Sequence, residues 1–387
     1  MGDGAASYLS LKLGEGNSKS AAKGVGNALT MLCISGISML VIGVLFIKQL
    51  AILFGATELI LPYALDYGKI IVIGLPFVII STGLNSIIRA DGSPKFAMFS
   101  MLLGALINVV LDPVFIFTFH MGVKGAALAT ILGQIASLIV TLFYIRKFKN
   151  ITLDKNSFNI EWSIARVVLG YGISSFITQI AITIVMGVMN NVLKIYGEIS
   201  IYGAEIPLTA LGIVMKVNQI LISIIVGIAV GAQPIIGYNF GAGNYKRVKK
   251  ALGIAIILST IVTVLAALLF QLIPQSIVNI FGSEEGLYNE FAVKCFRIFL
   301  LFCILNGFQT VSGIFLQAIG KPLKSAVVSL SRQIVFLIPA VIILPKFWGV
   351  VGVLWAGPVA DGLTFVLSVI IIVYEMKKIN KLEKLYN

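Results

Sequence analysis

The chain has 387 residues, of which 58% are hydrophobic and 12% are charged, and its mean hydropathy is +1.02. Soluble domains contain about 45–50% apolar and about 25% charged residues, so this composition excludes an ordinary soluble enzyme and predicts a protein embedded in a lipid bilayer. A net charge of +13 would suit a nucleic-acid binder, but Lys and Arg gather in a few short loops, which is typical of membrane proteins. We therefore expect the bilayer as partner and no nucleic acid.

Apolar runs long enough to cross a bilayer predict ten complete transmembrane helices. They are expected at residues 25–53, 59–88, 95–119, 122–145, 164–196, 206–238, 251–273, 288–318, 325–345 and 349–374. A further apolar segment, Met1–Leu13, is too short to cross. The predicted fold class is all-α, a polytopic membrane protein.

The chain contains a repeat. Three sets of residues recur at a spacing of 227 or 228 positions: Gly14, Gly16 and Asn17 with Gly241, Gly243 and Asn244; Gly92 and Pro94 with Gly320 and Pro322; Gly122 and Gly125 with Gly349 and Gly352. Because neither GxGN segment has the surroundings of a phosphate-binding loop, we expect tight turns in which glycine adopts positive φ. A parallel repeat predicts two pseudo-symmetric helical lobes.

The basic residues predict the orientation of the chain. Lys and Arg concentrate at residues 12–23, 89–95, 146–166, 246–250, 321–324 and 377–384, all in alternate loops. The positive-inside rule places these loops, with the first GxGN loop and the C-terminus, in the cytoplasm. We expect a multi-pass protein of a bacterial cytoplasmic (inner) membrane.

The polar connector at 146–166 predicts a boundary between an N-terminal lobe, 1–150, and a C-terminal lobe, 151–387. The second lobe has two spans before its GxGN loop, whereas the first has only Met1–Leu13. We therefore expect a truncated first lobe, lacking one helix and most of another. The alternative is an asymmetric protein whose first lobe is naturally short.

Asp112 and Asp361 are the acids well inside the expected spans, where an ionised side chain is costly and suggests function. Asn108 and Asp112 are four residues apart, so they share one helix face, and Pro113 should bend the helix. These groups predict a site for Na+ or H+; the alternative is a polar contact between helices. The equivalent positions of the second lobe hold Val335 and Pro339, so we expect coupling in the first lobe alone.

Asp361 predicts either a second cation site or contact for a positively charged substrate, or else a structural acid paired with Lys216 or Arg332. Seven amides within spans are candidates for lining a cavity, with helix packing as the alternative for each: Gln179, Asn190, Asn191, Asn218, Gln219, Asn306 and Gln309. The cysteines, Cys33, Cys295 and Cys303, lie in apolar stretches and are expected to be buried free thiols. With one histidine, the chain has no Cys and His cluster for zinc.

Together with the repeat, the motifs resemble those of multidrug and toxic compound extrusion (MATE) transporters. The motifs are the two GxGN loops, Asn108-Val109-Val110-Leu111-Asp112-Pro113, Gly125-Ala126-Ala127-Leu128-Ala129-Thr130 and Gln233-Pro234-Ile235-Ile236-Gly237-Tyr238-Asn239. The resemblance implies two six-helix lobes and an antiporter that exchanges Na+ or H+ for lipophilic, mostly cationic drugs.

The resemblance also implies a cation site made by the Asp112 carboxylate, the Asn108 amide oxygen, the Thr130 hydroxyl and the Ala126 carbonyl. Asp112, Asn108 and Thr130 would be metal ligands if the ion is Na+. The family site includes an acid on the first helix, which has no counterpart here. Some relatives carry acids in the second lobe where this chain has Gln179, Asn306 and Gln309, and we expect these amides, with Asp361, to contact substrate.

We expect no cofactor besides the transported Na+ or H+, and a monomer. A lipid-linked oligosaccharide flippase of the same superfamily is one alternative, although the spans hold few interior cations for pyrophosphate, chiefly Lys69, Lys216, Arg297 and Arg332. An inactive truncated fragment is another. Enzymatic activity is not expected, because the sequence shows no nucleophile and base pair.

Overall fold

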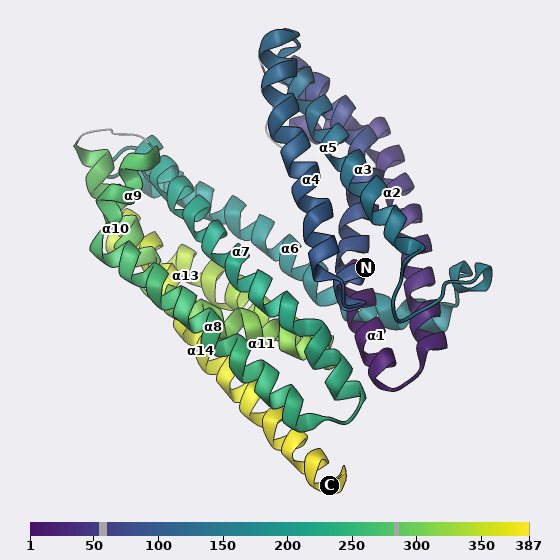
Figure 1. The fold of residues 1–387 in the computed structure, drawn as a ribbon. Coiled ribbons are helices and arrows are strands. Elements are labelled where there is room, and N and C mark those ends of the chain that lie inside the picture. The colour runs from purple at the N-terminus through teal and green to yellow at the C-terminus, as the bar shows by residue number, and fades with distance from the viewer. Residues whose placement is uncertain (54–59, 282–285, 387) are drawn as a thin grey trace. The chain divides into compact units, whose positions relative to one another are not determined.

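The computed structural model describes residues 1–53, 60–281 and 286–386, which form helices joined by turns, with no strand among them (Figure 1). They divide into two compact units, Met1–Gly172 and Ile173–Asn387. The first unit contains α1 (Gly2–Gly14), α2 (Ser18–Leu53), α3 (Leu61–Ala90), α4 (Pro94–Pro113), the π-helix η1 (Val114–Thr118), α5 (Gly122–Ile145), the 3-10 helix η2 (Lys155–Phe158) and the beginning of α6 (Trp162–Glu198).

The second unit begins within α6. It continues with α7 (Glu205–Gly241), α8 (Tyr245–Leu272), α9 (Pro274–Phe281), α10 (Leu287–Phe299), the 3-10 helix η3 (Cys303–Leu305), α11 (Asn306–Ala318), α12 (Pro322–Leu330), the π-helix η4 (Ser331–Leu337), α13 (Ile338–Ile343) and α14 (Pro345–Tyr386). The last helix is kinked at Gly349, where φ is 58° and ψ is −147°.

The helices that can cross a bilayer agree with the ten predicted spans. Among the described residues, nine helical segments are long and apolar enough to cross, and the pair Leu287–Phe299 and Cys303–Ala318, bent by 42°, makes a tenth if it is one span. Residue 59, the expected start of the second span, lies outside the described residues. The 13 residues of α1 extend about 20 Å, shorter than the roughly 30 Å of hydrocarbon, as expected for Met1–Leu13.

The turns and helix starts confirm the repeat. Gly16 and Gly243, the second glycines of the two GxGN loops, have φ of 75° and 73°, a region that L side chains rarely adopt. The next helix begins one residue after each loop, at Ser18 in the first unit and at Tyr245 in the second. The equivalent helices α4 and α12 both begin at a proline and both run into a π-helix. The repeated turns and the proline-initiated helices that run into π-helices therefore occur in both units.

The connector after α5 is bound to the first unit. Asp91, in the turn between α3 and α4, is fully buried and accepts hydrogen bonds from Tyr144 Oη at 2.7 Å and from the backbone nitrogen of Lys149 at 2.8 Å. The start of α6 also packs there, since a Cβ on Gly4 of α1 would lie 2.1 Å from the carbonyl oxygen of Val168. The division between units consequently falls at Gly172 within α6, later in the chain than the predicted boundary at 150 and 151.

Each unit has its own apolar core, while many large apolar side chains lie exposed, as expected for surfaces that face lipid. Leu9, Leu84 and Ile87 belong to the core of the first unit, and Phe291 and Phe296 to that of the second. Cys295 and Cys303 are buried and free, as predicted. Cys33 is also free, but the prediction that it is buried is wrong, because it lies on an exposed face of α2.

Candidate functional site

Two close contacts between backbones hold α4 against α5. A Cβ on Gly104 would lie 2.7 Å from the carbonyl oxygen of Gly133, and a Cβ on Gly133 would lie 2.5 Å from that of Gly104. Beyond the end of α4, a Cβ on Gly125 of α5 would lie 2.9 Å from the backbone carbon of Phe115 in η1. Small residues at these crossings allow the polar side chains between them to meet.

Three of the four predicted cation-site residues are connected by hydrogen bonds between these crossings. Thr130 Oγ1 donates to the carbonyl oxygen of Ala126 at 2.9 Å, one turn earlier on α5. Asn108 Nδ2, from α4, donates to Thr130 Oγ1 at 3.4 Å. The structure thus brings together residues of two helices that are 22 positions apart in the chain.

Asp112 lies one turn after Asn108 on α4, and its Oδ1 is buried without a hydrogen-bond partner among the residues that the structure describes. The helix changes character directly afterwards, because Pro113 has no backbone N–H and the π-helix η1 follows. A buried carboxylate oxygen without a partner is costly, and a bound proton or cation would compensate it.

The donor set fits a hard monovalent cation. A carboxylate, an amide, a hydroxyl and a backbone carbonyl offer oxygen atoms, the ligands that hard cations prefer. In the described parts of the chain, no group of three or more His, Cys, Asp and Glu side chains is placed to hold a metal ion. A tightly bound transition metal is therefore a poor match, whereas Na+ or H+ suits one carboxylate with neutral neighbours.

The candidate substrate residue Asp361 lies in an ion pair in the second unit. Arg332 Nε donates to Asp361 Oδ1 at 2.8 Å, and the two side chains are 22% and 3% exposed. Of the two basic partners considered for this acid, the structure selects Arg332. Gln309 joins the same cluster, because its Nε2 donates to the backbone oxygen of Asp361 at 2.7 Å.

The remaining predicted amides differ in their surroundings. Asn306 and Gln309 are buried one turn apart on α11, and Asn306 Oδ1 and Gln309 Oε1 have no partner within the described ranges. Gln179 lies on α6 with an exposed side chain. The structure therefore brings Gln309 to Asp361 and places Asn306 one turn before Gln309 on α11. No described hydrogen bond links the Gln179 side chain to this cluster.

Two buried acids escaped the sequence reasoning. Asp91 anchors the connector, and Glu375, fully buried on α14, is paired with both Lys321 and Lys324. Glu375 follows directly after residue 374, the expected end of the last span, so it lies outside the segments in which an acid suggests function. The sequence signal for Glu375 is the pair of lysines Lys321 and Lys324. If the last helix continues beyond residue 374, as α14 does, Glu375 is an acid that can pair with them.

A family model supplies the decisive comparison. The model of the MatE family matches residues 1–114 and 174–343, well over half of the chain. The chain belongs to the MatE family. The matched ranges include Asn108, Asp112, Asn306, Gln309 and Arg332, so most of the clusters described above lie in the part of the chain that the family shares.

Relatives of this MatE chain include the multidrug export protein MepA from two staphylococci. MepA of Staphylococcus aureus strain MRSA252 is 28% identical over 383 residues, which cover 97% of this chain and 81% of that protein. MepA of Staphylococcus haemolyticus strain JCSC1435 is 27% identical over 338 residues, covering 87% and 73%.

Solved structures share the fold. A MOP superfamily transporter from Pyrococcus furiosus superposes with a TM-score of 0.90 at 21% identity, covering 99% of this chain and 84% of that one. A multidrug resistance MATE family transporter in an outward-facing conformation gives the same TM-score and coverage at 22% identity. The predicted all-α MATE-like fold is thereby confirmed for this transporter.

Proposed function

We propose that this MatE chain is an antiporter that exports lipophilic, mostly cationic drugs in exchange for Na+ or H+, with Asp112 as the residue that takes up the cation. Its MepA relatives, named as multidrug export proteins, support the export of drugs. The observation that carries the coupling is the position of Asp112 Oδ1 in a helix able to cross the bilayer, buried and without a hydrogen-bond partner among the described residues.

The mechanism follows from the cost of a charge in an apolar region. When Asp112 is ionised, a proton or Na+ from outside lowers the energy of the site. Pro113 and η1 give α4 a place to bend when the charge changes, because the regular i to i−4 hydrogen bonding is interrupted there. Cation binding favours the state with weak drug affinity, and loss of the cation inside favours drug uptake. Such coupling requires that each ligand binds the two states with different affinity.

The two candidate ions make different demands on the neighbours of Asp112. A proton needs only the carboxylate. Na+ would draw on the oxygen atoms of Asn108, Thr130 and Ala126. In the structure Asn108 instead donates its Nδ2 hydrogen to Thr130 Oγ1, which donates to the Ala126 carbonyl oxygen. Sodium binding would therefore turn the Asn108 amide so that its oxygen, rather than its nitrogen, faces the ion.

The observed ion pair argues against the flippase alternative. A carrier of lipid-linked pyrophosphate needs unpaired cations in its interior. Arg332, one of the four interior cations considered, is already neutralised by Asp361. The structure offers no specific support for that function.

The test uses the full chain in proteoliposomes, compared with Asp112→Asn, while ethidium movement is driven by an imposed Na+ gradient and by a pH gradient separately. Transport driven by one gradient and lost in Asp112→Asn is expected, and the effective gradient names the ion. Asp66→Asn is the matched control, because Asp66 is an acid of the same unit that is half-exposed and paired with Lys124 at 3.2 Å. Gradient-driven transport that persists in Asp112→Asn would refute the role of Asp112.

A further inference from the structure

A groove of about 480 Å³ runs between α7 and α8 of the second unit. Its walls are apolar over most of their length and include several small side chains that create the hollow. The apolar lining consists of Ile228, Gly231, Ala232, Ile235, Ala251, Ile254, Ala255 and Leu258. Such a lining between two bilayer-spanning helices fits a hydrocarbon chain.

One end of the groove is basic. Arg247 and Lys250 lie in the first two turns of α8, line the groove and are exposed. Neither forms an ion pair with any residue that the structure describes, whereas the adjacent Lys249 is bound to Glu383 at 2.5 Å. Two unpaired cations at the N-terminal end of a helix, where the helix dipole is also positive, attract a negatively charged group.

Asn239 adds a polar group to the same end. The residue lines the groove from α7 and is only 7% exposed. Its Nδ2 donates to the carbonyl oxygen of Ile235 at 2.8 Å, but its Oδ1 has no partner among the described residues. An acceptor left in this position suits a ligand that carries a hydroxyl donor next to its anionic group.

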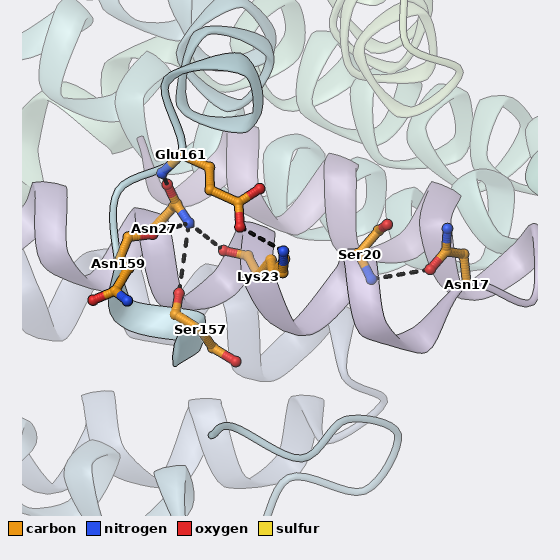
Figure 2. A network of polar contacts seen from close by, with 7 residues as sticks. All are labelled: Asn17, Ser20, Lys23, Asn27, Ser157, Asn159 and Glu161. Carbon is orange, nitrogen blue, oxygen red and sulfur yellow. Dashed lines mark hydrogen bonds and ion pairs between the residues drawn. The ribbon is translucent and has the colours of Figure 1, made fainter. Parts of the chain in front are cut away.

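The repeat shows what covers the equivalent helix face in the first unit. At a spacing of 227, Lys23, Gly26 and Asn27 of α2 correspond to Lys250, Gly253 and Ile254 of α8. In the first unit the connector occupies this face, and Lys23 forms an ion pair with Glu161 of the connector (Figure 2). Their Nζ and Oε1 atoms are 2.5 Å apart. The contact is close, since a Cβ on Gly26 would lie 2.1 Å from the carbonyl oxygen of Ser157.

The same face of the second unit is open. The two helix faces coincide at Lys250 and Ile254, the counterparts of Lys23 and Asn27, and both residues line the groove and are exposed. Lys250 has no acid opposite it comparable to Glu161 in the described chain. The connector thus supplies the first unit with both a cover and a counter-charge, whereas the described residues of the second unit place neither at Lys250 and Ile254. In a bilayer, a lipid is the molecule that can supply an apolar cover and a negative charge together.

We propose that the groove between α7 and α8 binds an anionic phospholipid with a hydroxylated headgroup. One acyl chain lies along the apolar walls, the phosphate lies between Arg247 and Lys250, and a headgroup hydroxyl donates to Asn239 Oδ1. The basic loop at 246–250 is expected on the cytoplasmic side, so the lipid belongs to the cytoplasmic leaflet.

The test is native mass spectrometry of the full chain purified with palmitoyl-oleoyl phosphatidylglycerol or the matching phosphatidylcholine. The wild-type chain is expected to retain phosphatidylglycerol, and the double variant Arg247→Gln/Lys250→Gln is expected to retain it about tenfold less, because each basic contact contributes to headgroup binding. Arg146→Gln/Lys147→Gln removes the same charges from an exposed stretch of the first unit and should leave retention unchanged. Equal retention in the two double variants would overturn the proposal.

A second variant tests the hydrocarbon contact without a change of charge. Ala251→Trp fills the wall of the groove and is expected to lower phosphatidylglycerol retention at least about tenfold, if the acyl chain lies there. Excess inorganic phosphate should fail to displace the lipid. Undiminished retention in Ala251→Trp, or full displacement by phosphate alone, would show that the groove does not hold a lipid chain.

Discussion

Arg332 Nε donates to Asp361 Oδ1 at 2.8 Å and thereby connects the π-helix η4 to the long helix α14. The acid is almost completely buried, and Gln309 of α11 is bonded to its backbone. Three segments of the second unit therefore meet at one charged pair. This arrangement gives Asp361 a structural role that can be separated from a role in substrate binding.

Replacing one member of this ion pair should lower the stability of the protein more than replacing both. Arg332→Met leaves the buried Asp361 carboxylate unpaired, and we expect it to lower the free energy of unfolding by about 3–5 kcal/mol. Arg332→Met/Asp361→Leu should recover most of that loss. Thermal unfolding of the two variants in detergent measures the loss and the recovery of stability. If the stable double variant still binds ethidium as the wild type does, Asp361 is no substrate contact; weakened binding in a stable protein would support the predicted contact.

The close crossing of α4 and α5 predicts the effect of a single methyl group. In Gly133→Ala the new Cβ would lie 2.5 Å from the carbonyl oxygen of Gly104, so the helices must move apart. We expect a loss of about 1–3 kcal/mol in stability and a separation of Asn108 from Thr130. Gradient-driven drug transport should fall with it.

Gly170→Ala provides the control for this change. Gly170 lies in α6, and a Cβ there meets no described atom within 4 Å. Alanine is the better helix former, so this variant should be unchanged or more stable by about 0.5–1 kcal/mol. Equal stability of Gly133→Ala and Gly170→Ala would contradict the close crossing of α4 and α5 at Gly133.

Substitution of Asp91 should destabilise the protein far more than substitution of an exposed acid of the same unit. In Asp91→Ala, Tyr144 Oη and the backbone nitrogen of Lys149 lose their acceptor in a buried place, and we expect a loss of about 3 kcal/mol. Asp66→Ala removes only a half-exposed ion pair with Lys124 and should cost less than about 1 kcal/mol. Unfolding curves of the two purified variants test the difference.

Asn27 is the central contact between α2 and the connector (Figure 2). Its Nδ2 donates to the carbonyl oxygen of Asn159 at 3.0 Å, and its Oδ1 accepts from the backbone nitrogen of Glu161 at 2.7 Å. In Asn27→Leu the Glu161 backbone amide loses its acceptor. We expect its hydrogen to exchange with solvent at least about tenfold faster, because local opening no longer requires this hydrogen bond to be broken.

Lys23→Gln tests the exposed part of the same contact. The Lys23 and Glu161 side chains are 44% and 41% exposed, so water already screens their ion pair. Loss of this charge should change exchange at Glu161 by less than about threefold. A larger effect in Lys23→Gln than in Asn27→Leu would show that the ion pair, rather than the buried amide, holds the connector.

Part of the candidate site was predictable from short-range spacing. Asn108 and Asp112 are one helical turn apart, so their common face on α4 follows from helix geometry alone. Thr130 and Ala126 entered only through the family resemblance, because no local pattern relates them to Asp112. The structure supplies the reason: Gly104 and Gly133 allow α5 to approach so closely that Thr130 reaches Asn108.

The amino-acid sequence alone predicts a helical membrane protein, the positions of its spans and its two repeated halves. These properties depend on local hydropathy, on glycine in tight turns and on the distribution of Lys and Arg, all of which act over a few neighbouring residues. Three features became visible in the folded chain: Arg332 pairs with Asp361, and Glu375 pairs with two lysines. The connector covers α2, whereas no described segment covers the matching Lys250 and Ile254 of α8. Those outcomes depend on contacts between segments far apart in the chain, where packing selects one partner from several with the same chemistry.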